Sequence, residues 1–301
     1  MQGKFRLIFV KPHFCANFSD MADTAQLQKI ASQIRRDIIR MVHAVQSGHP
    51  GGSLGCADYF TALFFELMEH HPEKFSLDGK GEDVFILSNG HISPVYYSAL
   101  ARSGYFPVSE LNTFRKINSR LQGHPATAEH LEGIRVATGS LGQGLSVAIG
   151  IALQKKLDKD PHLVYCLCGD GEIQEGQIWE ALMFASHNKM DNLILTVDVN
   201  GRQIDGDTKD IMGFGDLRPK FEAFGFHVME MDGNNINEVL SVLKSAKAAS
   251  NQGRAVVVLM RTEMGYPIDF MMGSHKWHGV APIDEELMRG LAQLEETLGD
   301  Y

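Results

Sequence analysis

Residues 168–176 read CGDGEIQEG and directly follow a short apolar run at 162–168. A second apolar run at 192–197 leads into Asp198-Val199-Asn200, and residues 177–187 between the runs carry apolar side chains at helical spacing. Short apolar runs are typical of buried strands, and the intervening period is typical of an amphipathic helix. The segment therefore predicts a strand, a helix and a second strand of an α/β fold.

Polar side chains stand where these two strands end. Asp170 follows the first strand and Asn200 follows the second. If the strands are parallel, a right-handed crossover makes them neighbours, so we expect both side chains at one edge of the sheet, where open α/β sheets bind ligands. Carboxylate and amide oxygens suit Mg²⁺ or Ca²⁺, and a glycine such as Gly171 lets a phosphate approach the backbone. The sequence predicts a site for a divalent metal and a phosphorylated cofactor.

Composition narrows the class of protein. The chain has 301 residues, 44% of them hydrophobic, and 30 glycines, which suits a well-packed α/β protein. Its formal net charge of −9 argues against a general binder of nucleic acid or of anionic membranes. No apolar stretch approaches the roughly 20 residues that a membrane-spanning helix needs. The four cysteines show no paired CxxC spacing and fit a reducing cytoplasm.

Apolar periodicity predicts one domain over residues 22–301, preceded by a poorly ordered N-terminal extension at 1–21. Helices are expected at residues 25–45, 57–69, 94–102, 109–117, 145–157, 237–250 and 285–298. Further strands are expected at 84–87 and 255–260, and residues 221–228 lead into another. This order predicts an α/β fold with a mostly parallel central sheet flanked by helices on both faces.

Four histidines, His49, His91, His124 and His278, lie in turns or loops between these elements. A single histidine is more often structural than catalytic. Four that converge on one sheet edge would suit a polyhydroxylated substrate, because imidazole can donate or accept a hydrogen bond and titrates near neutral pH. A zinc site is the alternative, but only His275 and His278 are closely spaced and no cysteine is nearby.

The central motif resembles a known cofactor signature. Gly169-Asp170-Gly171, then 27 residues, then Val199-Asn200 is similar to the thiamine diphosphate signature, in which GDG is followed after a comparable spacer by two asparagines. Val199 replaces the first asparagine. The second, which binds the metal in the family, is present as Asn200.

Further motifs occur in the order found in transketolases. They are SGHPGGSLG at 47–55, SNGH at 88–91, GHP at 123–125, TGSLGQG at 138–144, GDGEIQEG at 169–176 and WHG at 277–279. The chain thus resembles the transketolase family from residue 49 to residue 279, and the resemblance implies a thiamine diphosphate-binding fold.

The resemblance also implies roles for individual residues. The residues that face the sugar and the reactive end of the cofactor are His49, His124 and His278, the last preferred over His275. The residues that contact the cofactor elsewhere are His91, Gly139, Ser140, Leu141 and Gly171, with Ile204 against the thiazolium ring. The metal ligands are Asp170, Asn200 and the backbone carbonyl of Arg202, while Glu175 is the catalytic glutamate that meets the partner domain.

These motifs cover the diphosphate-binding half of a transketolase. The chain therefore resembles the amino-terminal subunit of a split bacterial transketolase. That resemblance implies a partner subunit carrying the pyrimidine-binding domain, an α2β2 assembly, and transfer of a two-carbon ketol unit between sugars with thiamine diphosphate and Mg²⁺. Two alternatives remain open: the alpha subunit of a 2-oxoacid dehydrogenase, which shares the GDG site, and a non-catalytic protein that uses the fold to bind a partner.

Overall fold

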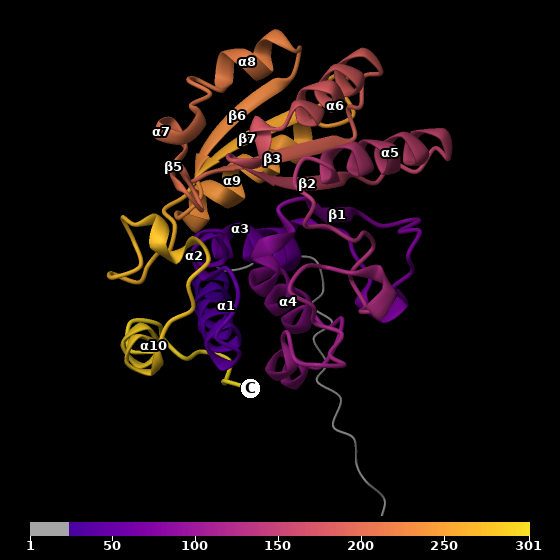
Figure 1. The fold of residues 1–301 in the computed structure, drawn as a ribbon. Coiled ribbons are helices and arrows are strands. Elements are labelled where there is room, and N and C mark those ends of the chain that lie inside the picture. The colour runs from indigo at the N-terminus through magenta and orange to yellow at the C-terminus, as the bar shows by residue number, and fades with distance from the viewer. Residues whose placement is uncertain (1–23) are drawn as a thin grey trace, which may run out of the picture.

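A five-stranded parallel sheet forms the centre of the molecule, with strand order β1-β2-β3-β7-β6 (Figure 1). The structure, a computed structural model, describes residues 24–301, so the extension predicted at 1–21 lies outside the described residues. The strands are β1 (Val84–Leu87), β2 (Val164–Gly169), β3 (Leu193–Val199), β6 (His227–Asp232) and β7 (Val256–Arg261). The prediction of a mostly parallel central sheet is confirmed.

Helices cover both faces of this sheet, because successive side chains of a strand point to opposite faces and both sets are apolar. Phe85 and Tyr165 pack into one layer, whereas Ile86 and Cys166 pack into the other. The first layer is formed by α1 (Thr24–Ala44), α3 (Ala57–Ala62), α4 (Ser93–Arg102) and α9 (Ile236–Ala249). The second layer, above the sheet in Figure 1, is formed by α5 (Gly144–Leu157), α6 (Gly176–His187) and α8 (Arg218–Ala223).

The β2–α6–β3 unit has the order that the sequence predicted. β2 and β3 are parallel neighbours, and Gly169 pairs with Asp198 across the ladder. Asp170 is the first residue after β2, and Asn200 is the first residue after β3. This register brings the two side chains to the same edge of the sheet.

The helix predicted at 109–117 is wrong. A 3₁₀ turn spans Val108–Thr113, and the chain then bends because Arg115 and Asn118 have positive φ angles of 56° and 63°. A right-handed helix requires φ near −63°, so it cannot continue through these residues.

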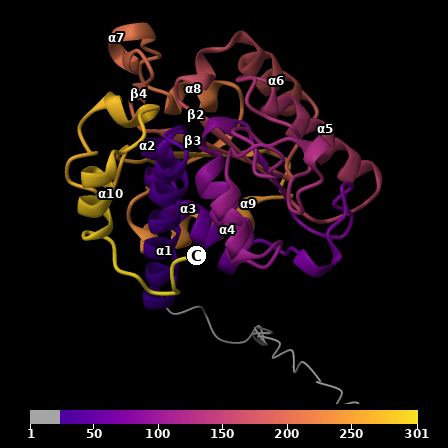
Figure 2. The ribbon, with the colours of Figure 1, turned by 60° about the horizontal axis from the view of Figure 1, so that its bottom comes forward.

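Two other predicted helices are shorter than the periodicity indicated. The helix expected at 57–69 is α3 followed by a π-helical turn at Leu63–Leu67. The helix expected at 285–298 ends as α10 (Asp284–Leu291), which lies beside α1 (Figure 2). Beyond α10, the backbone N–H groups of Thr297 and Leu298 donate to Gln33 Oε1 of α1 at 3.0 Å each, so tertiary hydrogen bonds replace helical ones.

Short elements complete the fold. They are α2 (Pro50–Gly55), the antiparallel pair β4 (Arg202–Gln203) and β5 (Gly206–Asp207), α7 (Thr208–Met212), and 3₁₀ turns at Pro72–Lys74, Gly90–Ile92, Thr127–Glu129, Glu172–Gln174 and His275–His278. None of the helices described within residues 24–301 has the length and apolar character needed to span a membrane.

Candidate active site

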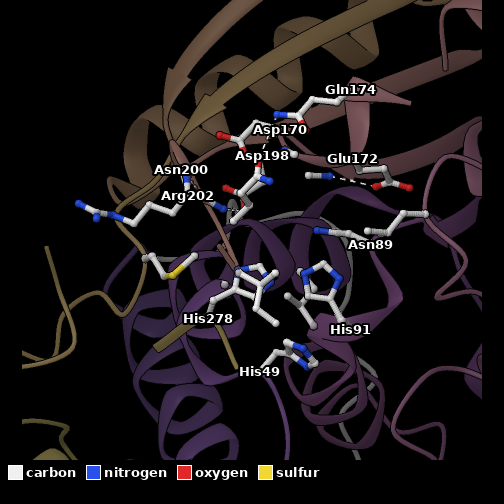
Figure 3. A pocket seen from close by; sticks show the side chains of 18 of the residues that line it. His49, Asn89, His91, Asp170, Glu172, Gln174, Asp198, Asn200, Arg202 and His278 are labelled. Atoms are coloured by element: carbon white, nitrogen blue, oxygen red, sulfur yellow. Dashed lines mark hydrogen bonds between the residues drawn. The ribbon is translucent and has the colours of Figure 1, made fainter. Parts of the chain in front are cut away.

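A cavity of about 400 Å³ opens at the carboxyl ends of β1, β2 and β3 (Figure 3). Twelve of the residues singled out in the sequence line it: His49, His91, His124, Gly139, Leu141, Asp170, Gly171, Glu175, Asn200, Arg202, Ile204 and His278. Segments far apart in the chain therefore meet in one pocket. Ser140 is not among its lining residues and is exposed to solvent, and His275 is likewise exposed outside it.

Oxygen atoms from the ends of β2 and β3 form one end of the pocket. Asp170 is buried, and its carboxylate accepts hydrogen bonds from Gly171 N at 2.7 Å and from Gly201 N at 2.6 Å. Asn200 Nδ2 donates to Asp198 Oδ2 at 2.7 Å, and Asn200 Oδ1 accepts from Arg202 N at 2.9 Å. The amide is thereby held in one orientation beside the carboxylate.

The electrostatics at this end favour a cation. Burial and the nearby Asp198 carboxylate raise the pKa of Asp170 to about 7. Burial also raises the pKa of Asp198, whose side chain accepts a hydrogen bond from Thr262 Oγ1 at 2.5 Å. A divalent ion would offset the repulsion between two buried carboxylates, and carboxylate, amide and carbonyl oxygens are the donors that Mg²⁺ and Ca²⁺ prefer. The residues present fit such an ion.

Metal binding at this end should be coupled to proton release. If Asp170 is a metal ligand, it must be ionised to bind, so its pKa of about 7 means that the ion would displace a proton in acidic solution. We expect binding of Mg²⁺ to release close to one proton at about pH 6 and almost none at about pH 8, with apparent affinity falling about tenfold per pH unit below 7. Calorimetry in two buffers of different ionisation enthalpy measures this, and an unchanged proton count at both pH values would contradict it.

Three imidazoles cluster at the other end of the pocket (Figure 3). The ring centroids of His49 and His91 are 5.0 Å apart, those of His91 and His278 are 5.2 Å apart, and those of His49 and His278 are 5.6 Å apart. Burial lowers the pKa of His49 to about 4 and holds the pKa values of His91 and His278 below their usual range. The three rings are therefore neutral at pH 7 and can each donate and accept a hydrogen bond.

Zinc coordination does not fit this cluster. Within residues 24–301, no group of three or more His, Cys, Asp or Glu side chains is arranged to hold a metal ion. The oxygen-rich end with Asp170 and Asn200 is a different kind of site, because it combines one carboxylate with amide and backbone oxygens.

The glycine-rich loop at 138–144 packs directly against the His124 turn. Gly139 has a φ angle of 122°, and a Cβ atom there would lie 2.6 Å from His124 Cδ2. Only glycine fits both the conformation and the contact. His124 is more exposed than the other three imidazoles, and burial together with the nearby Arg115 lowers its pKa.

Glu172 is a central residue of the pocket that the sequence did not single out. It is buried, and its carboxylate accepts hydrogen bonds from Ser88 Oγ at 2.5 Å, Gly142 N at 2.9 Å and Gly169 N at 3.1 Å. These donors come from the end of β1, the glycine-rich loop and the end of β2 respectively. One side chain thus joins three segments of the site. In the sequence, the only feature that indicated a role for Glu172 was its position directly after Gly169-Asp170-Gly171.

Polar atoms around the pocket lack partners within the described chain. Asn89 Oδ1, His49 Nδ1 and His278 Nδ1 are buried without a hydrogen bond. Buried polar groups in proteins are almost always paired, so such atoms at a pocket indicate a place where a ligand completes the bonding. Asn89 was also missed in the sequence, although it lies in the SNGH motif.

The mouth of the pocket is apolar and exposed. Ile204 is 63% exposed and Leu141 is 39% exposed, although both are large hydrophobic residues. Glu175, directly before α6, is exposed as well and lies against Gly142. Exposed apolar side chains at the rim of a polar pocket are typical of a surface that another molecule covers.

Comparisons with known proteins agree with this geometry. Residues 26–299 match the family described as transketolase, thiamine diphosphate binding domain. The chain is 38% identical over 270 residues to the 6-deoxy-6-sulfo-D-fructose transketolase subunit of Clostridium sp. (strain MSTE9), covering 90% of this chain and 96% of that protein. It is 37% identical over 272 residues to an apulose-4-phosphate transketolase subunit of Actinobacillus succinogenes, covering 90% and 96%.

Structural similarity points the same way. The crystal structure of transketolase from Campylobacter jejuni superposes with a TM-score of 0.82 and 33% identity, over 90% of this chain and 43% of that one. The chain therefore spans less than half of the single-chain enzyme but nearly all of each separate subunit. These matches confirm the predicted fold class and the predicted transketolase-type transferase subunit. The chain belongs to the transketolase family, in which it corresponds to the amino-terminal, thiamine diphosphate-binding part that some members carry as a separate subunit.

Proposed function

We propose that this protein binds thiamine diphosphate with Mg²⁺, or with Ca²⁺ in its place, and transfers a two-carbon ketol unit from a ketose to an aldose together with a second subunit. The observation that carries the proposal is that one pocket joins the buried Asp170 carboxylate and the Asn200 amide, at the ends of β2 and β3, with three neutral imidazoles. When bound, thiamine diphosphate would supply the nucleophilic carbon and the electron sink needed to break and re-form the carbon–carbon bond beside the ketose carbonyl.

Asp170, Asn200 and the backbone carbonyl of Arg202 would hold the metal and through it the diphosphate. His91, Gly139, Leu141 and Gly171 line the same pocket and would contact the cofactor. Ser140 is exposed and does not line the pocket, so we assign it no direct contact.

His49, His124 and His278 would face the sugar. His49 and His278 each have a buried Nδ1 without a partner, and their lowered pKa values keep them neutral, so each can take a proton from one hydroxyl and return it to an oxygen. His124 would hydrogen-bond the donor fragment from the more open side of the pocket.

A second polypeptide would close the pocket. Leu141, Ile204 and Glu175 are exposed at the rim, and a subunit carrying the pyrimidine-binding domain would cover them. We propose an α2β2 assembly. We also place the protein in the cytoplasm, because Cys56, Cys166 and Cys168 are buried free thiols of the kind that a reducing compartment preserves.

The substrates are proposed to carry an anionic group at the end remote from the transferred fragment. The two related subunits are named for a sulfonated and a phosphorylated sugar. Among the described residues, Arg202 is the one basic Lys or Arg side chain that lines the pocket, and its guanidinium is paired with Asp207 at 3.0 Å. We therefore expect the partner subunit to supply most of the groups that bind the anionic end of the substrate.

Replacing His124 by alanine is expected to lower ketol transfer about 100-fold or more while thiamine diphosphate binds with nearly unchanged affinity. The reason is that His124 lies on the sugar side, away from Asp170 and Asn200. The measurement is a coupled ketol-transfer assay of the assembled enzyme beside calorimetric titration of the cofactor. His130→Ala, at an exposed histidine in a nearby turn, is the control. A parallel loss of cofactor binding in His124→Ala would contradict the assignment.

The proposed function is tested by isolating the native partner and assaying the pair with a panel of ketose donors and aldose acceptors. Ketol transfer should require both chains, thiamine diphosphate and a divalent ion. A parallel assay of decarboxylation with a lipoyl acceptor distinguishes the 2-oxoacid dehydrogenase alternative. Full activity of this chain alone, or cofactor binding that is indifferent to a metal chelator, would refute the proposal.

A further inference from the structure

Arg115 occupies a conformation that its own residue type disfavours. It follows the 3₁₀ turn Val108–Thr113 and has a φ angle of 56°, in the left-handed region. Its backbone N–H donates to Leu121 O at 2.8 Å, which closes the bend. Residues other than glycine persist in this region when the surroundings determine them, and such residues are concentrated near functional sites.

The guanidinium of Arg115 lies between two turns that carry pocket histidines. Its Nη1 donates to Ser47 Oγ at 3.0 Å, and Ser47 is two residues before His49. Its Nη2 lies 3.5 Å from Gly123 O, a long hydrogen bond, and Gly123 directly precedes His124. One side chain therefore contacts both the His49 turn and the His124 turn, which are more than 70 residues apart in the sequence.

Gly123 makes this contact possible. A Cβ atom at position 123 would lie 2.7 Å from Arg115 Cζ and 2.9 Å from Arg115 Nε. The guanidinium is thus packed against the backbone of the His124 turn. The carbonyl of Gly123 is also fixed from the other side, because Ser93 Oγ of α4 donates to it at 2.8 Å.

The charge of Arg115 is not neutralised nearby. No ion pair is formed by Arg115 among residues 24–301, and its buried Nε has no hydrogen-bond partner there. Burial lowers the pKa of this guanidinium, and its charge in turn contributes to the lowered pKa values of His49 and His124. The other titratable groups acting on His49 are His278 and His124. A partly buried cation without an ion-pair partner costs free energy of folding, so stability by itself does not explain this arginine.

We propose that Arg115 is a positioning residue, which ties the turn before His49 to the turn before His124 and so sets the spacing of the two imidazoles that face the sugar. Arg115 does not line the pocket, so it acts through the histidines and does not touch the substrate. The sugar-facing role of these histidines rests on the proposed function, whereas the link between the two turns rests on the contacts alone.

Two substitutions separate the geometry from the charge. Arg115→Lys keeps a positive charge but cannot bridge Ser47 and Gly123 with one planar group. Arg115→Gln removes both the bridge and the charge. Lys116→Gln is the matched control, because Lys116 is an exposed neighbouring cation whose ammonium group donates to Asn112 Oδ1 at 3.2 Å.

In the assembled enzyme, we expect both Arg115 variants to raise KM for the ketose about tenfold or more, because small displacements of positioned groups weaken productive binding strongly. Affinity for thiamine diphosphate should change less than about twofold, since Arg115 does not line the pocket that contains Asp170 and Asn200. In the chain without sugar, Arg115→Gln should move the NMR titration midpoints of His49 and His124 upward by roughly half a unit, and Arg115→Lys should leave them near the wild-type values.

The outcomes distinguish the possible failures. A wild-type KM in Arg115→Lys would overturn the bridging role. If both variants have a lowered thermal midpoint but a wild-type KM and unchanged histidine titrations, Arg115 is a purely structural residue. This result would also overturn the positioning role. If the wild-type pair of subunits transfers no ketol unit, the proposed function fails. The histidine titrations and chemical shifts of the two variants still decide whether Arg115 couples the two turns.

Discussion

Replacing Asp170 by alanine is expected to lower the affinity for thiamine diphosphate in the presence of Mg²⁺ about 100-fold or more. Asp170 is the carboxylate directly after β2 that lies in the pocket with Asn200, and Asn200 alone offers only a neutral oxygen. Calorimetric titration of the cofactor with and without a metal chelator measures the effect. In the variant, the chelator should make almost no further difference.

The Asp170→Ala protein should remain folded, which keeps this result interpretable. The substitution removes the repulsion between two buried carboxylates. This gain in folding free energy offsets the loss of the hydrogen bonds from Gly171 and Gly201. The thermal midpoint of the metal-free chain is therefore expected to stay within about 4 °C of wild type. Asp158→Ala, at an exposed aspartate after α5, is the control and should bind the cofactor normally. Metal-dependent binding of wild-type strength in Asp170→Ala would show that the ion is held elsewhere.

Replacing Glu172 by alanine is expected to lower the free energy of unfolding by about 3–5 kcal/mol. The substitution leaves Ser88 Oγ, Gly142 N and Gly169 N without their acceptor in a buried place. Chemical denaturation measures the loss. Cofactor affinity should fall as well, because the glycine-rich loop is no longer tied to the end of β2.

Two further variants sharpen the Glu172 test. Glu172→Gln keeps one acceptor oxygen and should lose less stability than Glu172→Ala, because fewer donors are left unpaired. Glu180→Ala removes an exposed glutamate of α6 and should change the unfolding free energy by less than about 0.5 kcal/mol. Equal losses in Glu172→Ala and Glu180→Ala would contradict the role given to Glu172.

Local patterns were sufficient for the centre of the fold. The β2–α6–β3 unit was predicted because its strands are short apolar runs and the crossover rule makes them neighbours. The same rule placed Asp170 and Asn200 at one sheet edge, as the structure does. The family motifs added the histidines, of which His49, His91 and His278 form one cluster.

Contacts between distant residues explain what the sequence did not reveal. The hydrogen bond from Ser88 to Glu172 spans 84 positions, and no periodicity encodes it. The helix expected at 109–117 failed because the left-handed Arg115 is stabilised by Leu121 and by the turns around it, whereas its own propensity favours a helix. Ser140 was assigned from its neighbours in a motif and is exposed in the described chain, so its contact with the cofactor stays a prediction.

The docking of the last residues on α1 has a kinetic consequence. Gln33 and Arg36 are buried on α1, yet Gln33 Oε1 accepts from Thr297 N, 264 positions later, and Arg36 Nη1 donates to Leu294 O at 2.7 Å, 258 positions later. Ribosomes add about 5–20 residues per second, so these partners are made roughly 13 to 50 seconds after Gln33 and Arg36 themselves. A nascent chain interrupted before residue 294 would leave both polar groups and the adjoining apolar side chains of α1 uncovered. We therefore expect α1 to be most exposed to proteases and to aggregation while the chain is being synthesised.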